Sequence, residues 1–441
     1  MISKRIELTL KECLIKVVDN RGKTPPISDA ISPYPLIEVN AIVGAAKSPN
    51  FSAIKKFVTE GTYKNWFRAG HPLPGDIIFS TVGSIAEVAL FEAGNGCIAQ
   101  NLIALRPNLE IVLPDFLYYS LVHPKMQSYL KTLDISSVQP SIKVPHLLAT
   151  KITIPSLAEQ KFIGDFLSNF DSRINLLRET NDTLESIAQA LFKSWFIDFD
   201  PVHAKARGLM PEGMDEATAE LFPDSFEETE LETVPKDWRL FVIYDLATFI
   251  NGAAYKAFEP NMYRRGLPII KIAELKAGVT ENTAYSNIEM PKKYRIETGD
   301  ILFSWSGNPD TSIDTFVWSF DPGWLNQHIF RVLPHQKNER AFVLQALRYL
   351  RPVFAELARN KQTTGLGHVT VADLKRLRIT KPEQKILDAF EGVVGSIQHQ
   401  IFQNAMRVNT LVDLRDTLLP QLISGQLRIA DAETETENVP P

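Results

Sequence analysis

Two similar strings decide the fold of this chain: PGDIIFSTVGS at residues 74–84 and TGDILFSWSGN at residues 298–308. The second string follows the first at an offset of 224 residues. Further along, 99–107 (AQNLIALRP) matches 326–334 (NQHIFRVLP), and 144–155 (VPHLLATKITIP) matches 371–382 (VADLKRLRITKP), both at an offset of 227. Self-similarity at one fixed spacing indicates an internal duplication, here of a module too long to be a solenoid repeat.

Each copy reads as a mixed α/β globule followed by a long helix. Short runs rich in β-branched and aromatic residues, such as IIFS, LIALR and KITIP, are typical of strands, and Pro-Gly or Gly-Asp turns separate them. A stretch with helical periodicity lies between the second and third runs, at 115–131 in one copy and 339–359 in the other.

The helix that follows each globule carries an apolar heptad seam. The seam residues alternate at spacings of four and three: Phe170, Ile174, Leu177, Asn181, Leu184, Ala188, Leu191 and Trp195 in the first helix, and Val394, Ile397, Ile401, Asn404, Val408, Leu411, Arg415, Leu418 and Leu422 in the second. Since a lone apolar stripe is unstable in water, we expect the two helices to pair as an antiparallel coiled coil. Ser156 is the expected N-cap of the first helix, Pro382 the expected N1 proline of the second and Gly425 its end. The seam residues Asn181 and Asn404 are either tolerated polar positions or a register lock.

The sequence therefore predicts an α/β (mixed) fold with two similar domains and a pseudo-twofold internal repeat. The predicted boundaries are a first globular domain at 1–155, a first helix at 156–198, an acidic linker at 199–237, a second globular domain at 238–381, a second helix at 382–425 and a tail at 426–441.

Composition sets further limits. The chain has 441 residues, 44% of them apolar, and two cysteines, Cys13 and Cys97, so a disulfide framework is excluded. Together with the lack of a membrane-length apolar run or a signal-peptide core, this indicates a soluble, cytoplasmic protein. The formal charge of −5 conceals a segregation: residues 211–237 carry −9 and residues 431–441 carry −4, which leaves a mildly basic remainder. Such a body is compatible with nucleic acid as a partner but does not require it.

No complete catalytic motif is found. Gly22, Lys23 and Thr24 lack the first glycine of a phosphate loop, because position 17 is Val17. The Asp/Asn-Pro-Pro-aromatic motif of amino-methyltransferases is missing, and the histidines and cysteines lack metal-ligand spacing. We therefore expect a non-catalytic chain without a metal or cofactor of its own.

The stretch ALFKSWFIDFDPVHAKARGLMPEGMDEATAELFPDSF (190–226) resembles the central region of the specificity subunit of Type I restriction–modification systems. DNRGKTPP (19–26), the two GD-I-x-FS strands, the Pro-x-x-Ala-Glu-Gln start of the first helix and LRDTLLPQLISGQLRI (414–429) add to the resemblance, which covers nearly the whole chain. The second helix start departs from it, because Lys381-Pro382-Glu383-Gln384 lacks a counterpart of Ser156-Leu157-Ala158.

The resemblance implies two target recognition domains, each reading half of a bipartite sequence in double-stranded DNA, with the helices setting the spacer. It also implies two methyltransferase subunits that use S-adenosylmethionine as partners, joined by restriction/translocase subunits that use ATP and Mg. Two other classes remain open: a two-headed non-catalytic interaction scaffold, and a fragment of a fused restriction–methylation enzyme.

Candidate DNA contacts follow from side-chain chemistry in the loops where the two copies diverge, since base edges are read by amide, hydroxyl, guanidinium or apolar groups. The base-reading candidates are Ser80, Thr81, Ser84, Gln100, Asn101, Ser136, Ser137 and Gln139 in the first globule, and Ser304, Trp305, Ser306, Asn308, Gln327, His328, Thr363, Thr364 and His368 in the second. Each is alternatively a turn-stabilising residue, and Gln100 and Gln327 share a repeat position. The phosphate candidates are Lys55, Lys56, Lys64, Arg68, Lys292, Lys293, Arg295 and Lys361. The aromatic residues Phe192, Trp195, Phe196 and Phe199 are either a core plug or a docking surface for a methyltransferase subunit.

Overall fold

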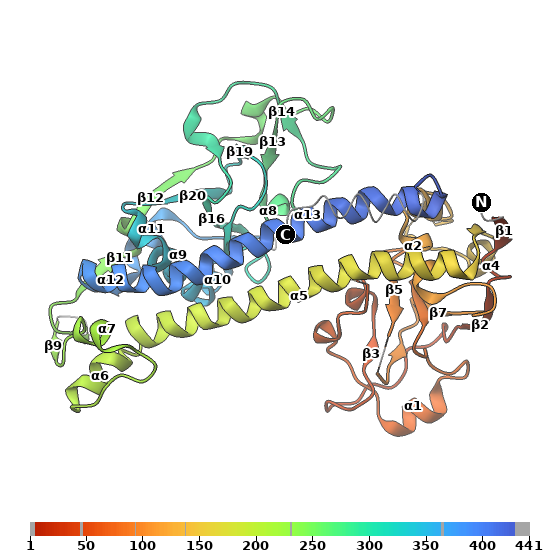
Figure 1. The fold of residues 1–441 in the computed structure, drawn as a ribbon, viewed down its shortest axis with the longest axis horizontal. Helices are drawn as coiled ribbons and strands as arrows, with labels where there is room; N and C mark the ends of the chain where they lie inside the picture. The colour runs from red at the N-terminus through yellow and green to blue at the C-terminus, as the bar shows by residue number, and fades with distance from the viewer. Residues whose placement is uncertain are drawn as a thin grey trace. The chain divides into compact units, whose positions relative to one another are not determined.

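The computed structural model describes residues 5–44, 47–92, 94–136, 138–229, 232–362 and 366–427. It divides into two compact units: unit 1 comprises residues 1–176 and 410–441, and unit 2 comprises residues 177–409 (Figure 1). Each unit thus contains one globule together with part of each long helix. None of the described helices is long and apolar enough to cross a membrane.

A four-stranded antiparallel sheet forms the centre of unit 1, in the strand order β2-β7-β4-β5. Its strands are β2 (Leu14–Val18), β7 (Leu102–Pro107), β4 (Asp76–Ser80) and β5 (Val88–Phe91). Every residue of β4 and β5 is buried. The remaining strands pair as β1 (Ile6–Thr9) with β8 (Lys151–Ile154), and as β3 (Leu36–Ile37) with β6 (Cys97–Ile98) in parallel.

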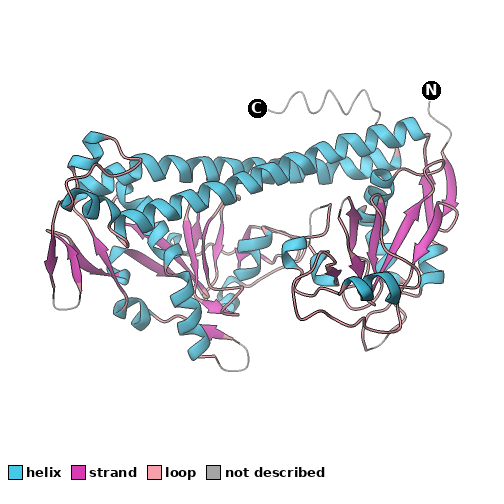
Figure 2. Cartoon of the chain, turned by 90° about the horizontal axis from the view of Figure 1, so that it is seen from below, coloured by secondary structure: helices cyan, strands magenta, loops and turns pink. Residues whose placement is uncertain are grey.

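Unit 2 repeats this plan. Its central sheet has the strand order β12 (Ala247–Asn251), β20 (Ile329–Pro334), β16 (Ile301–Ser304) and β18 (Asp314–Val317). The pair β11 (Arg239–Val242) with β22 (Arg378–Lys381) corresponds to β1 with β8. A second sheet has the order β14 (Tyr285–Ser286), β13 (Leu267–Ile270), β19 (Gly323–Leu325) and β15 (Arg295–Ile296). Its parallel pair β13–β19 corresponds to β3–β6. Figure 2 shows the strands of both units in magenta and the helices in cyan. The predicted duplication and the predicted strands are confirmed.

The turn shared by the two copies of the duplicated string is built in the same way in both units. Asp76 accepts a hydrogen bond from the Leu73 N–H at 2.8 Å, and Asp300 accepts one from the Glu297 N–H at 2.6 Å. Each carboxylate also pairs with an arginine of the central strand, Asp76 with Arg106 and Asp300 with Arg331, both at 2.8 Å. The Gly-Asp dipeptide therefore starts β4 and β16 in the same way.

The predicted helix between the second and third strands is two helices in each unit. Unit 1 has α2 (Pro114–Val122) and α3 (Pro124–Thr132), and unit 2 has α9 (Arg340–Tyr349) and α10 (Arg351–Asn360). Pro124 and Pro352 lie in the first turn of the second helix of each pair, where a proline lacks the N–H that would continue the preceding helix.

The first long helix, α5 (Leu157–Phe196), is continuous over 40 residues. The Oγ of Ser156 accepts the Glu159 N–H at 3.3 Å, which confirms the predicted N-cap. The second begins as α12 (Gln384–Phe390), passes through a π-helical turn (Glu391–Gly395) and continues as α13 (Ser396–Ser424). Glu383 is its N-cap, so the prediction of Pro382 at N1 is wrong, whereas Gly425 ends α13 with φ +77° as predicted.

The two asparagines of the seam bond to each other in unit 2. The side-chain amide of Asn404 donates to Asn181 Oδ1 at 2.9 Å, and that of Asn181 donates to the carbonyl of Ile401 at 3.1 Å. Asn404 is 2% exposed and also accepts a hydrogen bond from Gln400 Nε2. In unit 1, the seam residue Arg415 pairs with the buried Asp171 at 2.6 Å. Polar seam positions are thus matched in pairs, as a buried polar group requires.

The segment 199–237 was predicted as an acidic linker, and the structure corrects this. It contains α6 (Asp200–Ala206), α7 (Glu216–Glu220) and the hairpin of β9 (Phe226–Glu228) with β10 (Thr233–Pro235). Val202 and Phe222 are at most 2% exposed and belong to the main core of unit 2. Apolar residues spaced among the acids therefore anchor this segment to the second globule.

Candidate nucleic-acid interface

Three separate segments of unit 1 meet at the end of β4. The Thr81 N–H donates to the Asn101 carbonyl at 2.8 Å, and the Ile142 N–H donates to the Thr81 carbonyl at 2.9 Å. Val82 and Ser141 form a β-bridge beside these bonds. We call the described residues of 80–84, 100–101 and 134–142 loop cluster 1.

Unit 2 contains the same arrangement at the end of β16. The Trp305 N–H donates to the His328 carbonyl at 3.3 Å, and the Val369 N–H donates to the Trp305 carbonyl at 2.8 Å. Ser306 pairs with His368, joining β17 (Ser306–Gly307) to β21 (Gly367–His368). The described residues of 304–308, 326–328 and 366–369 form loop cluster 2.

The two clusters share backbone bonds and differ in side chains. The offsets of 224 and 227 carry Thr81, Asn101 and Ile142 onto Trp305, His328 and Val369, so both hydrogen bonds recur at equivalent positions. The β-bridge recurs as well: the pair Val82–Ser141 in unit 1 corresponds to the pair Ser306–His368 in unit 2. One framework therefore displays two different sets of side chains, and the sequence-predicted loops are brought together in both units.

Three of the base-reading candidates are corrected by burial. Ser80, Thr81 and Ser304 are each 0% exposed. Ser80 Oγ donates to the Ser84 carbonyl at 2.6 Å, and Thr81 Oγ1 lies 3.1 Å from the carbonyl of Asn101. The hydroxyls of Ser80 and Thr81 thus bond to the backbone within loop cluster 1 and do not face a ligand. Ser304 Oγ is buried without a hydrogen-bond partner among the described residues, so it is not accessible to a ligand either.

The other described candidates are at least partly accessible. The exposed ones are Ser84, Gln100, Ser136, Gln139, Asn308 and His368, and the half-buried ones are Asn101, Trp305, Ser306, Gln327 and His328. Asn308 and Ser136 also accept backbone N–H bonds within their own turns. Ser137, Thr363 and Thr364 lie outside the described residues.

The indole of Trp305 is held in place within loop cluster 2. Its Nε1 donates to Asn251 Oδ1 at 3.1 Å, and its ring centroid lies 5.6 Å from that of His328. Burial lowers the pKa of His328, so its ring is neutral at pH 7. Gln327 lies next to it and accepts the Tyr255 N–H at 2.9 Å, which makes Gln327 part of the framework. The sequence analysis did not find Asn251 or Tyr255, because only the fold brings them to this cluster.

The phosphate candidates are exposed, with one exception. Lys361 is half-buried and pairs with Asp373, the N3 residue of the capping box of α11 (Val371–Arg376). Burial raises the pKa of Asp373, but the hydrogen bonds from Lys361 and Thr370 outweigh it and lower that pKa overall. Lys361 therefore stabilises the start of α11, and its role as a phosphate contact stays a prediction.

Among the exposed phosphate candidates, some have acidic neighbours. Lys56 pairs with Glu38 at 2.8 Å, Lys64 with Glu60 at 2.5 Å and Arg295 with Glu297 at 2.9 Å. Within the described ranges, no ion pair is found for the remaining candidates, Lys55, Arg68, Lys292 and Lys293. Surface pairs of this kind are weak and can exchange for a phosphate.

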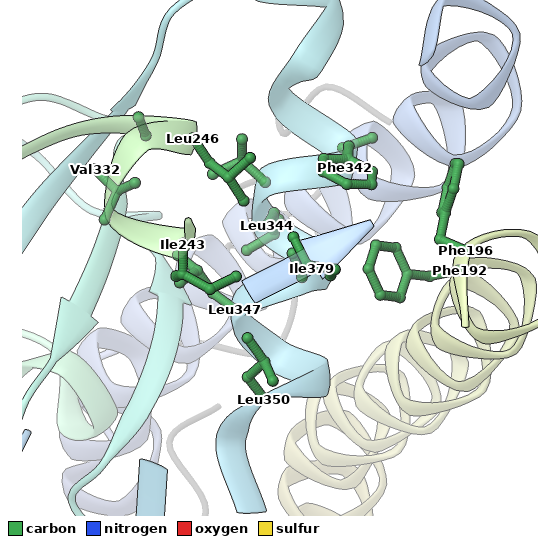
Figure 3. Packing of buried hydrophobic residues seen from close by; sticks show 14 of the residues in the cluster. Phe192, Phe196, Ile243, Leu246, Val332, Phe342, Leu344, Leu347, Leu350 and Ile379 are labelled. Carbon is green, nitrogen blue, oxygen red and sulfur yellow. The ribbon is translucent and has the colours of Figure 1, made fainter. Parts of the chain in front are cut away.

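The aromatic segment at the end of α5 is core. Phe192, Trp195 and Phe196 are at most 6% exposed. Phe196 lies 5.0 Å from Phe342 and 4.8 Å from Phe390 between ring centroids, and Figure 3 shows Phe192 and Phe196 pointing from α5 toward Phe342. Phe199 is half-buried, 5.8 Å from the ring of Trp238. Of the two alternatives given for these residues, the core plug describes Phe192, Trp195 and Phe196, because their side chains fill the main core of unit 2, and Phe199 packs against it. These three buried rings do not form an exposed docking surface.

No described cluster of three or more histidine, cysteine or acidic side chains is arranged to hold a metal ion. Burial raises the pKa of the Cys13 thiol to about 11 and that of Cys97 to about 12, so neither thiol is an activated nucleophile. The accessible chemistry of loop cluster 1 is hydrogen bonding, and loop cluster 2 adds aromatic contact through Trp305 and His328.

Fold and site define a class: a tandem duplication of one α/β recognition module, in which each module presents a different loop cluster and is followed by a long helix. Comparison with known sequences identifies the family to which the chain belongs. The chain matches the family described as the Type I restriction modification DNA specificity domain over residues 56–186 and 235–405, and it belongs to that family.

Relatives with similar sequences carry corresponding names. The Type I restriction enzyme HindI specificity subunit of Haemophilus influenzae is 26% identical over 404 residues, covering 80% of this chain and 86% of the relative. The MjaIX specificity subunit of Methanocaldococcus jannaschii is 26% identical over 359 residues, covering 79% and 78%. Among solved structures, the S subunit of a Type I restriction–modification system from M. genitalium is similar in fold, with a TM-score of 0.54 at 15% identity, covering 95% of this chain and 96% of that one.

Proposed function

We propose that this chain is the DNA recognition subunit of a Type I restriction–modification complex, and that each unit reads one half of a bipartite target in double-stranded DNA. The observation that carries the proposal is the pair of loop clusters, which repeat their backbone bonds and change their side chains. Specificity carried by loops on a shared rigid framework allows two different sequences to be read by one fold.

The chemistry of the complex is assigned to partner chains. The proposed partners are two adenine-methylating subunits that bind S-adenosylmethionine, and restriction/translocase subunits that use ATP and Mg. The family membership and the absence of a methyltransferase motif from the sequence support a non-catalytic role for this chain.

The paired helices are proposed to set the spacer between the two half-sequences. Two polar pairs oppose sliding of one helix along the other: Asn181 with Asn404 in the seam, and the seam residue Arg415 with Asp171, which lies next to the seam. Four residues inserted after Asn181 lengthen α5 by about 6 Å and change its facing by about 40°. We expect unchanged half-sequences and a spacer wider by one or two base pairs, measured as methylation of duplexes whose spacer varies in single steps. A folded variant that keeps the original spacer would show that the helices do not set it.

Salt dependence of binding separates this function from an interaction scaffold. The chain, assembled with its methyltransferase subunits, is titrated into a duplex that contains the target mapped by sequencing of methylated DNA. Recognition predicts a steep loss of affinity with rising salt, since phosphate contacts release counterions, and a large preference for the target over a scrambled duplex. A scaffold that joins two proteins predicts neither result.

A further inference from the structure

The loop before β13 in unit 2 presents two large apolar side chains to solvent. Tyr263 is 81% exposed and Met262 is 58% exposed. Single exposed apolar residues are common and need no function. Three further observations separate this loop from that background.

The first is that the loop is held in one conformation. Asn261 and Tyr285 exchange two backbone hydrogen bonds of 2.8 Å, and Asn261 Oδ1 accepts the N–H groups of Tyr263 and Arg265 at 3.1 and 3.2 Å. Gly266 has φ +83°, and a Cβ at this position would lie 2.0 Å from the Ser286 carbonyl oxygen. Because the tip is already ordered, its binding to a partner would lose little conformational entropy.

The second is positive charge around the aromatic tip. The guanidinium of Arg264 lies 5.6 Å from the ring of Tyr285, and that of Arg265 lies 5.7 Å from the ring of Tyr263. Neither arginine has an ion pair within the described residues. The exposed bases Lys256, Lys292 and Lys293 lie on elements that pack around the same small core as β13.

The third is repetition. In unit 1 the strand β3 is the counterpart of β13, and a loop precedes it as well. A β-bridge between Ser28 and Phe57 anchors this loop. The bridge between Asn261 and Tyr285 anchors the loop of unit 2 in the same way. That loop presents Ile31, which is 86% exposed. An exposed apolar tip in both copies of a diverged duplication points to a shared use.

We propose that the loop 261–266 is a second DNA-contact element of unit 2, separate from loop cluster 2, with Ile31 as its counterpart in unit 1. Tyr263 and Met262 pack into a groove against a base or sugar face, as the apolar wedges of groove-binding proteins do. Arg264 and Arg265 neutralise neighbouring phosphates. DNA is favoured as the partner, because Arg264 and Arg265 have no ion pair within the described residues and a row of phosphates supplies an anion to each of them. This inference rests on the proposed function.

The test measures DNA binding by the chain assembled with its methyltransferase subunits, using a duplex that carries the mapped target. Tyr263→Ala is expected to weaken target binding by roughly 5- to 150-fold, the range for one aromatic contact to a base. Tyr263→Phe should bind as the wild type does. Arg264→Ala and Arg265→Ala should each reduce the salt slope by about 1. The matched control is Leu209→Ala, because Leu209 is 58% exposed in the same unit and lies outside the loop.

The outcomes separate the possibilities. If the wild type prefers its target and Tyr263→Ala binds equally well, the loop is not a DNA contact, although the proposed function stands. If Tyr263→Ala instead weakens assembly with the methyltransferase subunits, the loop contacts protein and the inference is overturned. If the wild type shows no preference for the mapped target, the proposed function itself fails.

Discussion

Replacing Asn404 by leucine tests whether the paired amides of the seam stabilise and register the helices. The substitution removes the donor to Asn181 Oδ1 and the acceptor for Gln400 Nε2. Each buried polar group left without a partner costs about 1–3 kcal/mol, and water can reach the half-buried Asn181. We therefore expect a loss of about 2 kcal/mol, or roughly 4–8 °C in the midpoint of thermal unfolding of a unit this size.

The double variant Asn181→Leu/Asn404→Leu supplies the matched comparison. Replacing both partners with apolar residues leaves no unpaired amide between them, so the double variant should recover most of the lost stability. Its register should be less well defined, which predicts methylation of targets with more than one spacer length. Tryptophan fluorescence follows the unfolding, since unit 2 holds five of the six tryptophans. If Asn404→Leu costs less than about 0.5 kcal/mol, or if the double variant loses the sum of the two single losses, the amides do not act as a pair.

Three further predictions concern stability. Phe192→Ala should destabilise unit 2 by about 3–5 kcal/mol, because it leaves a cavity in the core. The control Ile187→Ala, at a position 45% exposed on the same helix, should change the stability of unit 2 little. Equal losses of stability for the two variants in denaturant unfolding would contradict the packing. Arg415→Ala leaves the Asp171 carboxylate, on a residue 6% exposed, without its cation and should destabilise unit 1 by about 3–5 kcal/mol, and an unchanged unfolding midpoint would refute this. Burial lowers the pKa of His71 below that of the unfolded chain, so the folded state disfavours the proton. Stability should therefore fall as the pH drops below about 6.5, the ordinary histidine value. In His71→Gln the unfolding temperature should depend less on pH between about 5 and 7, and an unaltered pH profile would show that His71 does not cause the dependence.

The sequence predicted the framework because periodic patterns report on buried faces. The GD-I-x-FS strings became β4 and β16, and the heptad positions of α5 and α13 are buried or half-buried. The offset between the two copies also identified the loops that converge in each cluster, since homologous strands bring homologous loops together. These features depend on local pattern and repetition, which a single sequence contains.

The sequence could not predict which polar side chains face solvent. Ser80, Thr81 and Ser304 have the chemistry of base readers, but each lies where a strand ends within its unit and is 0% exposed. The aromatic run with Phe192 and Phe196 is compatible in sequence with either a core or an interface. Only the fold shows that both rings pack against Phe342. Tyr263 was overlooked because its exposure depends on the bonds between Asn261 and Tyr285, which join residues 24 positions apart.

The central claim is that one chain carries two independent readers. It is tested most directly by exchanging residues 1–155 for the corresponding part of a related specificity subunit and sequencing the methylated sites in DNA from cells that express the complex. The account predicts a bipartite target in which one half-sequence changes, while the other half-sequence and the spacer stay the same. A target in which both halves change together would contradict it.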